Sequence, residues 1–113
     1  MIEKIDKKLK MLVTVVKKGL GSAVVEASKD AGCEGGTILP GCGTSNKDQS
    51  SFLGLSFNPE KEVILSVLDE DIAYKALREI TKAANLDEPG NGIAFILNLQ
   101  SVTGIAHLLD SNN

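Results

Sequence analysis

The sequence is poor in aromatic and metal-binding residues. Its 113 residues include no tryptophan, one tyrosine, three phenylalanines, one histidine and two cysteines. Aromatics at 4% leave Val, Ile, Leu and Ala to build the core. Cys33 and Cys42 are too few for a disulfide framework, and with His107 they do not reach the three or four suitably spaced ligands of a metal site. We therefore expect two reduced thiols, no bound metal, and a histidine that belongs to the C-terminal tail.

A basic excess and a long apolar segment are also missing. The formal net charge is −3, so the chain has no surplus of lysine and arginine with which to release counterions from a phosphate backbone. The apolar run from Met11 to Val16 is too short for a signal-peptide core or a membrane-spanning helix. We expect a cytoplasmic protein without a nucleic-acid partner.

Signatures of catalysis are missing as well. The chain contains no Ser-His-Asp arrangement, no HExxH motif and no P-loop. The carboxylates of Asp69, Glu70 and Asp71 are explained by a helix whose dipole favours negative charge in its first turn. Ser22 is explained in a similar way, as a helix cap rather than a nucleophile. We predict that the protein is not an enzyme.

What the sequence does contain is a regular order of apolar strands and amphipathic helices. Runs rich in Val, Ile and Leu predict four strands. These strands cover residues 11–18, 35–39, 62–68 and 93–99. One helix is predicted to begin at Ser22 and to end at Gly32 in a left-handed conformation, and a second is predicted to begin at Asp69. Their buried stripes are Leu20, Val24, Ala27 and Ala31 in the first, and Ala73, Leu77, Ile80 and Ala84 in the second.

The order β-α-β-loop-β-α-β predicts an α+β fold, a ferredoxin-like βαββαβ sandwich. We expect a single domain over residues 1–113, with an N-terminal extension over 1–10 and a C-terminal tail over 100–113. Both helices would cover one face of the sheet. Because the first and third strands are nearly continuous apolar runs, the opposite face needs cover, and other subunits are its natural source. The pattern therefore predicts a homo-oligomer.

The segment over residues 40–51 is polar and glycine-rich, with no apolar period. A dozen residues without structure are uncommon in so small a domain unless they are functional or disordered. We predict a binding arm that is mobile over 43–51 in the absence of ligand and partner, and the alternative is an inert surface connection. The residues expected to contact a partner are Gly41, Cys42, Gly43, Thr44, Ser45, Asn46 and Lys47.

With this order of elements, the chain resembles the P-II signal-transduction family (nitrogen regulatory protein P-II), in its divergent P-II-like branch. The resemblance is carried by Ala31-Gly32 followed by Gly35-Gly36-Thr37 and the polar loop, by Phe57 to Leu68 entering the third strand, and by Pro89-Gly90-Asn91-Gly92 before the last strand. It covers roughly residues 11–105, and its specificity lies in the order and spacing of the motifs rather than in any single one.

The resemblance implies a non-enzymatic regulator in nitrogen control. It implies a homotrimer with its sheets packed inward, and an adenine nucleotide (AMP, ADP or ATP) as effector in clefts between subunits. The polar loop, the T-loop of the family, would dock on a target protein that is often a membrane transporter or a metabolic enzyme. The ligand-binding residues would be Gly35, Gly36, Thr37, Gly90, Asn91 and Gly92. From the residues alone, the first glycines also fit a strand start or bulge, and the second group also fits a plain helix-to-strand turn.

The chain departs from the family pattern at several positions. Ile93 occupies the position at which the family has a phosphate-binding lysine. The positions of two arginines of the family fall near Gly104 and Ala106 in this chain. Glu34 replaces a threonine beside the adenine, and the only tyrosine, Tyr74, lies outside the loop. Burying several phosphate charges without cations is costly, so we predict weaker ATP binding and a preference for AMP, ADP or another small anion. Lys17, Lys18 or Lys61 from a neighbouring subunit could partly replace the missing cation.

Two other functions remain open at this point. One is a metal-tolerance-type trimeric protein of related ferredoxin-like fold, and the other is a small enzyme on the same fold. Titration with a panel of nucleotides separates the regulator from both, and the ion content of protein purified without chelator tests the first.

Overall fold

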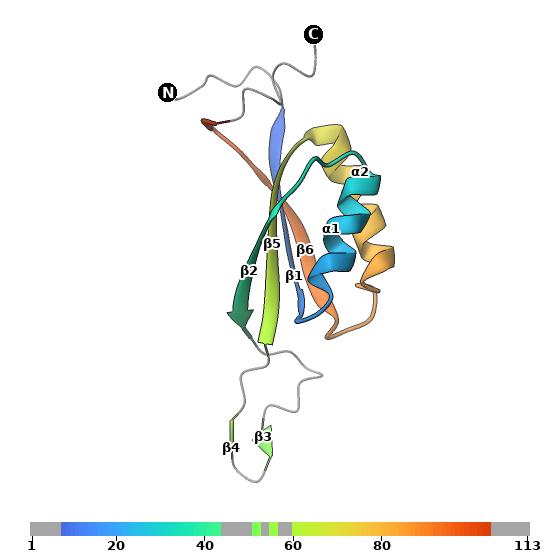
Figure 1. Ribbon diagram of the computed structural model, residues 1–113, viewed down its shortest axis with the longest axis vertical. Coiled ribbons are helices and arrows are strands. Elements are labelled where there is room, and N and C mark those ends of the chain that lie inside the picture. The colour runs from blue at the N-terminus through green and yellow to red at the C-terminus, as the bar shows by residue number, and fades with distance from the viewer. Residues whose placement is uncertain (1–7, 44–50, 53–54, 57–59, 105–113) are drawn as a thin grey trace.

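The computed structural model describes residues 8–43, 51–52, 55–56 and 60–104, and its main feature is a four-stranded antiparallel sheet with two helices (Figure 1). The sheet order is β2-β5-β1-β6, and a separate two-stranded sheet joins β3 to β4. This architecture confirms the predicted α+β class and is compatible with a ferredoxin-like fold. The elements are β1 (Leu9–Lys17), α1 (Gly21–Asp30), β2 (Thr37–Cys42), β3 (Ser51–Phe52), β4 (Leu55–Ser56), β5 (Glu60–Asp69), α2 (Glu70–Ala83) and β6 (Gly92–Asn98).

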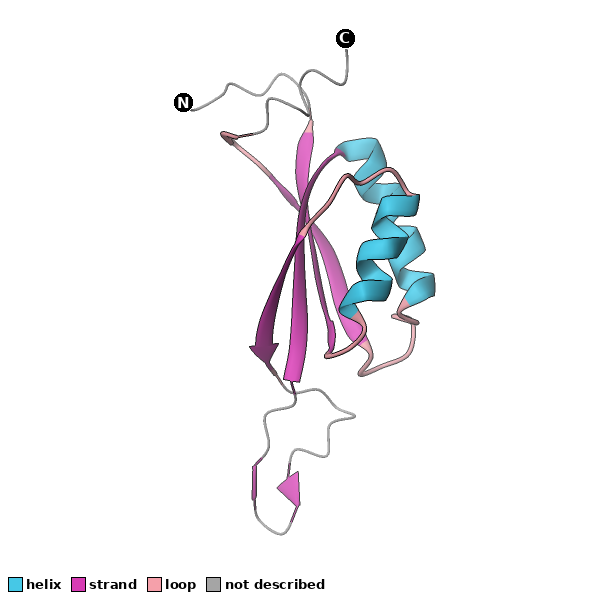
Figure 2. Cartoon of the chain, in the orientation of Figure 1, coloured by secondary structure: helices cyan, strands magenta, loops and turns pink. Residues whose placement is uncertain are grey.

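The core lies between the sheet and the two helices, which cover the same face (Figure 2). Strands β1 and β5 are central in the sheet, so their helix-facing side chains are the most deeply buried. The small residues on α1 and α2 let the helices approach the sheet and each other closely. The core residues are Leu12 and Val16 of β1, Val24 and Ala27 of α1, Ile64 and Leu68 of β5, and Ala73, Ala76 and Ile80 of α2.

One polar group is left unsatisfied in this core. The hydroxyl of Thr14 on β1 is buried and has no hydrogen-bond partner within the described part of the chain. A buried hydroxyl without a partner costs free energy, because it has lost its bonds to water. Thr14 therefore destabilises the core relative to an apolar residue of the same shape.

We expect Thr14→Val to raise the free energy of unfolding by about 1 kcal/mol, since valine has the same shape without the unsatisfied hydroxyl. Urea unfolding of the two proteins measures the difference. The matched control is Thr81→Val, because the Thr81 hydroxyl on α2 donates a hydrogen bond of 2.7 Å to the carbonyl of Leu77. If Thr81→Val raised the free energy of unfolding as much as Thr14→Val, the result would contradict this explanation.

The predicted cap of the first helix is wrong. Helix α1 begins at Gly21, so Ser22 is its second residue, and no side chain caps it locally. Glu62 of β5 serves the helix start instead: its Oε1 accepts hydrogen bonds from the backbone N–H groups of Gly19 at 2.8 Å and Gly21 at 2.9 Å. The negative charge of this carboxylate also suits the positive end of the helix dipole.

The other predicted helix boundaries are close to those observed. After α1, Gly32 has a φ of 115° and its N–H donates to the carbonyl of Lys29, while the N–H of Cys33 donates to Ser28. This is the predicted left-handed glycine at the helix end. Asp69 precedes α2 as predicted but makes no side-chain capping bond, and the N–H of Glu70 donates to the backbone carbonyl of Lys8 at 2.9 Å.

The segment predicted as a loop over residues 40–51 begins later than expected. Strand β2 continues through Pro40 and Gly41 to Cys42, which pairs with Glu60. Proline is tolerated there because β2 is an edge strand, where the missing N–H need not serve a ladder. Gly43 follows directly, whereas residues 44–50 lie outside the described residues, as does the mobility predicted for them and most of the expected partner-binding loop.

The sheet face opposite the helices is apolar, and no described element covers it. We call it the open face. Because side chains alternate along a strand, it is lined by the residues of all four strands that do not face the helices. On β6, Ile93 is 57%, Phe95 38% and Leu97 46% exposed. The other members are Met11, Val13 and Val15 of β1, Leu39 of β2, and Val63, Leu65 and Val67 of β5. So continuous an apolar surface makes the open face a candidate interaction site.

Candidate ligand-binding site

The two glycine segments predicted to bind a ligand lie on opposite edges of the sheet. Thr37 begins β2, with Gly35 and Gly36 just before it, whereas Gly92 begins β6, with Gly90 and Asn91 just before it. Strands β5 and β1 separate the two edges. Three strand spacings amount to about 14 Å. The structure therefore does not bring the two segments together within one chain.

The segment before β6 is held by its own internal contacts. The N–H of Asn91 donates to the carbonyl of Glu88 at 3.3 Å, and the Asn91 side chain donates to the carbonyl of Asn85 at 2.8 Å. Gly92 has a φ of 150°, and a Cβ at this position would lie 2.5 Å from the carbonyl oxygen of Val15. These contacts account for Asn91 and Gly92 as a helix-to-strand turn. An anion bound at this segment would have to compete with the carbonyls of Glu88 and Asn85 for the two amide groups of Asn91.

The segment before β2 is only partly explained by packing. A Cβ on Gly36 would lie 2.7 Å from the hydroxyl of Ser66, so Gly36 is needed for close contact with β5. Gly35 faces open space, and its carbonyl accepts a hydrogen bond of 2.9 Å from the thiol of Cys33. Gly35 therefore leaves the backbone accessible to a ligand, as does the exposed Thr37.

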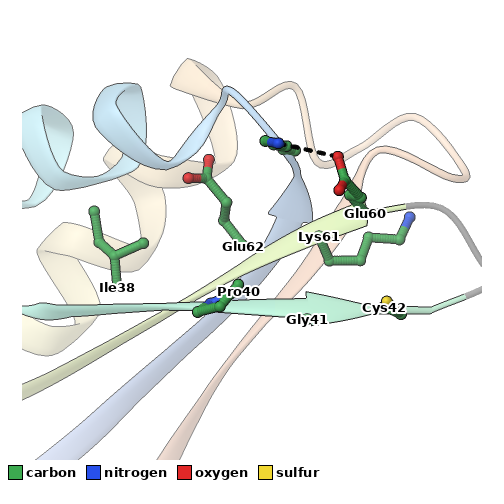
Figure 3. A pocket seen from close by; sticks show the side chains of 8 residues that line it. Ile38, Pro40, Gly41, Cys42, Glu60, Lys61 and Glu62 are labelled. Atoms are coloured by element: carbon green, nitrogen blue, oxygen red, sulfur yellow. Dashed lines mark ion pairs between the residues drawn. The ribbon is translucent and has the colours of Figure 1, made fainter.

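A pocket of about 410 Å³ lies where β2 ends and β5 begins, beside the β1–α1 turn (Figure 3). We call it the loop-base pocket, because it adjoins the connection between β2 and β5. It combines apolar side chains from the β2 edge with charged side chains from β5 and the turn. Its lining residues are Lys18, Ile38, Pro40, Gly41, Cys42, Glu60, Lys61 and Glu62.

Both carboxylates of the loop-base pocket bind groups at the β1–α1 turn. The ammonium group of Lys18 lies 3.1 Å from the carboxylate of Glu60, and the backbone N–H of Lys18 donates to the carbonyl of Glu60 at 3.2 Å. Glu62 is committed to the amides of Gly19 and Gly21. The β1–α1 turn is thus tied to the first residues of β5, the strand that leaves the loop.

The sequence patterns do not predict this pocket. Lys18 and Lys61 are named above only as cations that a neighbouring subunit could supply, and both line the pocket. Glu60, Glu62 and Ile38 were not considered, because residues of three separate segments form the pocket. The available signal was the alternation Glu60-Lys61-Glu62 at the start of an otherwise apolar strand. Such an alternation indicates that the strand leaves the core at that end.

The structure and the comparisons with known proteins add no other assignment. The described residues contain no group of three or more His, Cys, Asp or Glu side chains that could hold a metal ion. In the same part of the chain, no helix combines the length and apolar character needed to cross a membrane. No family model matches the chain, and a search of curated proteins finds no match. The similarity to the P-II family therefore rests on the motifs quoted above.

Proposed function

We propose that this protein is a non-enzymatic regulator of the P-II type. It forms a homotrimer, senses a small effector such as an adenine nucleotide between subunits, and acts on a target protein through the connection between β2 and β5. The observation that carries the proposal is the uncovered apolar open face of a small α+β domain. The order of the sequence motifs and the loop-base pocket support the sensing role.

The open face supports assembly, because its exposed residues need cover. Ile93, Phe95 and Leu97 would each bury apolar area in an interface, which is favourable by roughly 25 cal/mol per Å². Strand β6 is also an edge strand without proline or charge, from Gly92 to Asn98. Bare apolar edges of this kind promote uncontrolled association unless they are paired or covered. Copies of this chain packed sheet to sheet would cover both features.

The position of the glycine segments supports a ligand site between subunits. A ligand touching Gly35 and Gly90 in one chain would have to span the whole width of the sheet. If the β2 edge of one copy lies beside the β6 edge of the next, the two segments line one interface between copies. They are shifted along the strands, because Thr37 is level with Phe95 whereas Gly92 is level with Val16. The proposed effector cleft therefore requires the oligomer.

We expect AMP and ADP to bind more tightly than ATP. Ile93 is exposed and apolar where the family has a lysine, and the Asn91 amide is already hydrogen-bonded, so little in this turn offsets the additional phosphate charge. Isothermal titration of the protein with AMP, ADP and ATP at one salt concentration measures the three dissociation constants and so gives their order. Much tighter binding of ATP would contradict this ligand preference, and absence of binding by all three would remove the adenine-nucleotide assignment.

The regulatory part of the proposal has its own test. A pull-down from extract with the wild-type protein, with and without AMP, should recover a partner whose amount changes with the nucleotide. A variant that lacks residues 44–50 should recover none of it. A partner captured equally by both proteins would contradict the role of the loop.

A further inference from the structure

A further pocket lies at the end of the sheet opposite the loop-base pocket. Its volume is about 320 Å³, and it lies where β1 begins and β6 ends, beside the first residue of α2. In Figure 1 this is the end of the sheet away from the connection between β2 and β5. We call it the lysine pocket, because its lining includes Lys8 and Lys10, together with Glu70, Asn98 and Gln100. None of these residues lines the loop-base pocket.

Lys10 is the least satisfied charge of the lysine pocket. Its side chain is only 15% exposed, because it lies on the helix side of β1, as Leu12 and Val16 do. Among the described residues, its ammonium group donates a hydrogen bond to Oδ1 of Asn98, and its other partner, Oε1 of Glu70, lies 3.8 Å away, beyond hydrogen-bond distance. An ammonium group has three N–H donors, and a mostly buried charge with a single hydrogen-bond acceptor is costly. A further acceptor at Lys10 is therefore stabilising.

The neighbouring groups favour an anion as that acceptor. Lys8 also lies near Glu70, with its Nζ 3.9 Å from Oε2, so two ammonium groups share one carboxylate. The amide of Asn98 accepts from Lys10 through its oxygen, which leaves its NH₂ group as a donor. The lysine pocket therefore offers three donor groups and one positive charge in excess of its carboxylate.

The acidic residues beside the lysine pocket limit the range over which it attracts an anion. Asp69 and Asp71 flank Glu70 in the sequence, and neither lines the pocket. Their charges offset those of the lysines at a distance, so the pocket suits a compact anion that is held by direct hydrogen bonds. A tetrahedral oxoanion has enough oxygens to accept from all three donor groups at once, whereas a carboxylate has only two.

We infer that the lysine pocket binds a small tetrahedral oxoanion, such as sulfate or phosphate, between Lys8, Lys10 and the amide of Asn98. The anion replaces the carboxylate of Glu70, whose side chain is 32% exposed and can turn toward water. This exchange costs little, because both contacts of Glu70 with the lysines are longer than hydrogen bonds. The inference goes beyond the proposed function, since the site lies within one chain and outside the glycine segments of the proposed effector cleft.

Nuclear magnetic resonance of the isotope-labelled full chain tests this inference, because it gives both the place of the anion and its affinity. Sodium sulfate, exchanged against sodium chloride at constant ionic strength, should shift the signals of Lys8, Lys10 and Asn98, including the side-chain amide of Asn98, and the shifts should saturate. Acetate has two oxygens and leaves one donor group unserved, so it should bind at least about tenfold more weakly than sulfate.

Three variants test the groups that hold the anion. Lys10→Gln should weaken sulfate binding at least about tenfold, since it removes a charged donor. Lys8→Gln changes a side chain that is 80% exposed, so it leaves the core intact and should weaken binding by up to about fivefold. Glu70→Gln removes the competing carboxylate and should strengthen binding by up to about fivefold. The matched control is Lys82→Gln on α2, outside the lysine pocket, because Lys82 is 77% exposed and also lies 3.9 Å from a glutamate, Glu79. This control should leave sulfate binding unchanged.

Several outcomes would overturn the inference. Shifts that do not saturate, or that survive in both Lys8→Gln and Lys10→Gln, would indicate an adventitious ion only. Equal binding of acetate would overturn the preference for a tetrahedral anion, and weaker binding by Glu70→Gln would overturn the exchange with Glu70.

Titration with AMP separates this inference from the proposed function. Competition between sulfate and AMP would place the sulfate in the effector cleft and overturn the lysine pocket. Absence of sulfate binding, while AMP binds by calorimetry, would overturn the lysine pocket and leave the nucleotide sensor intact. Sulfate binding at the lysine pocket, without binding of AMP, ADP or ATP, would support the inference and overturn the nucleotide effector.

Discussion

Phe95→Arg is expected to convert the proposed trimer into a monomer at micromolar concentration. Phe95 lies on the open face, level with Val13 of β1 and Leu65 of β5, in the middle of the apolar surface. In the assembled protein, an arginine there would be buried without a partner, at a cost of about 3–5 kcal/mol per site. This cost weakens association by at least about 100-fold. Light scattering coupled to gel filtration measures the mass of the wild-type and variant proteins.

The control for Phe95 is Tyr74→Arg. Tyr74 is also an exposed aromatic residue, at 49%, but it lies on α2 in the helical layer. This variant should remain trimeric, since the helical layer faces away from the proposed interface. A wild-type protein that is monomeric at micromolar concentration would rule out the trimer, and a Tyr74 variant that dissociates would place the interface on the helices instead.

Gly92→Ala should lower the free energy of unfolding by about 3 kcal/mol, through backbone strain and overpacking together. The added Cβ would lie 2.5 Å from the carbonyl oxygen of Val15 and 3.0 Å from Cγ1 of Val16, and the φ of 150° is one that residues with a side chain rarely adopt. The obstacle at Val15 is backbone of the adjacent strand, which cannot move without disturbing the sheet. Urea unfolding at a fixed protein concentration measures the loss.

Gly35→Ala is the matched control for Gly92. A Cβ on Gly35 meets no atom within 4 Å, and its φ is not positive, so the stability should change by less than about 0.5 kcal/mol. Equal stabilities of the two variants would show that the close approach of Gly92 to β1 is not a constraint on the fold.

Much of the fold follows from local patterns in the sequence. Three of the runs that predicted the long strands cover seven or eight residues, and the run over residues 35–39 is shorter. All four strands are confirmed in the predicted order. The predictions are wrong where a residue distant in the sequence determines the local structure. Ser22 fits a local cap, but Glu62, some forty residues away, accepts the amides at the start of α1. Pro40 indicates a loop locally, but pairing with β5 keeps it in an edge strand.

The candidate site was harder to predict than the fold. The glycine segments were selected by motif, and the structure explains Gly36 and Gly92 by close packing within the chain. Their placement on opposite edges depends on the strand order, which no local pattern reveals. The loop-base pocket needs three separate segments to be brought together, and Glu62 gains its role only from the amides that it reaches.

The two edges of the sheet differ, and this difference would give the proposed assembly a direction. Pro40 interrupts the free edge of β2, whereas the edge of β6 is uninterrupted from Gly92 to Asn98. Contact between unlike edges is head-to-tail, and head-to-tail contacts either close into a ring or continue as a filament. Because a proline cannot donate a backbone hydrogen bond, the β2 edge accepts a neighbouring strand over only part of its length. Pro40 therefore weakens strand pairing between copies at the β2 edge, and its loss would strengthen that contact in a ring and in a filament alike.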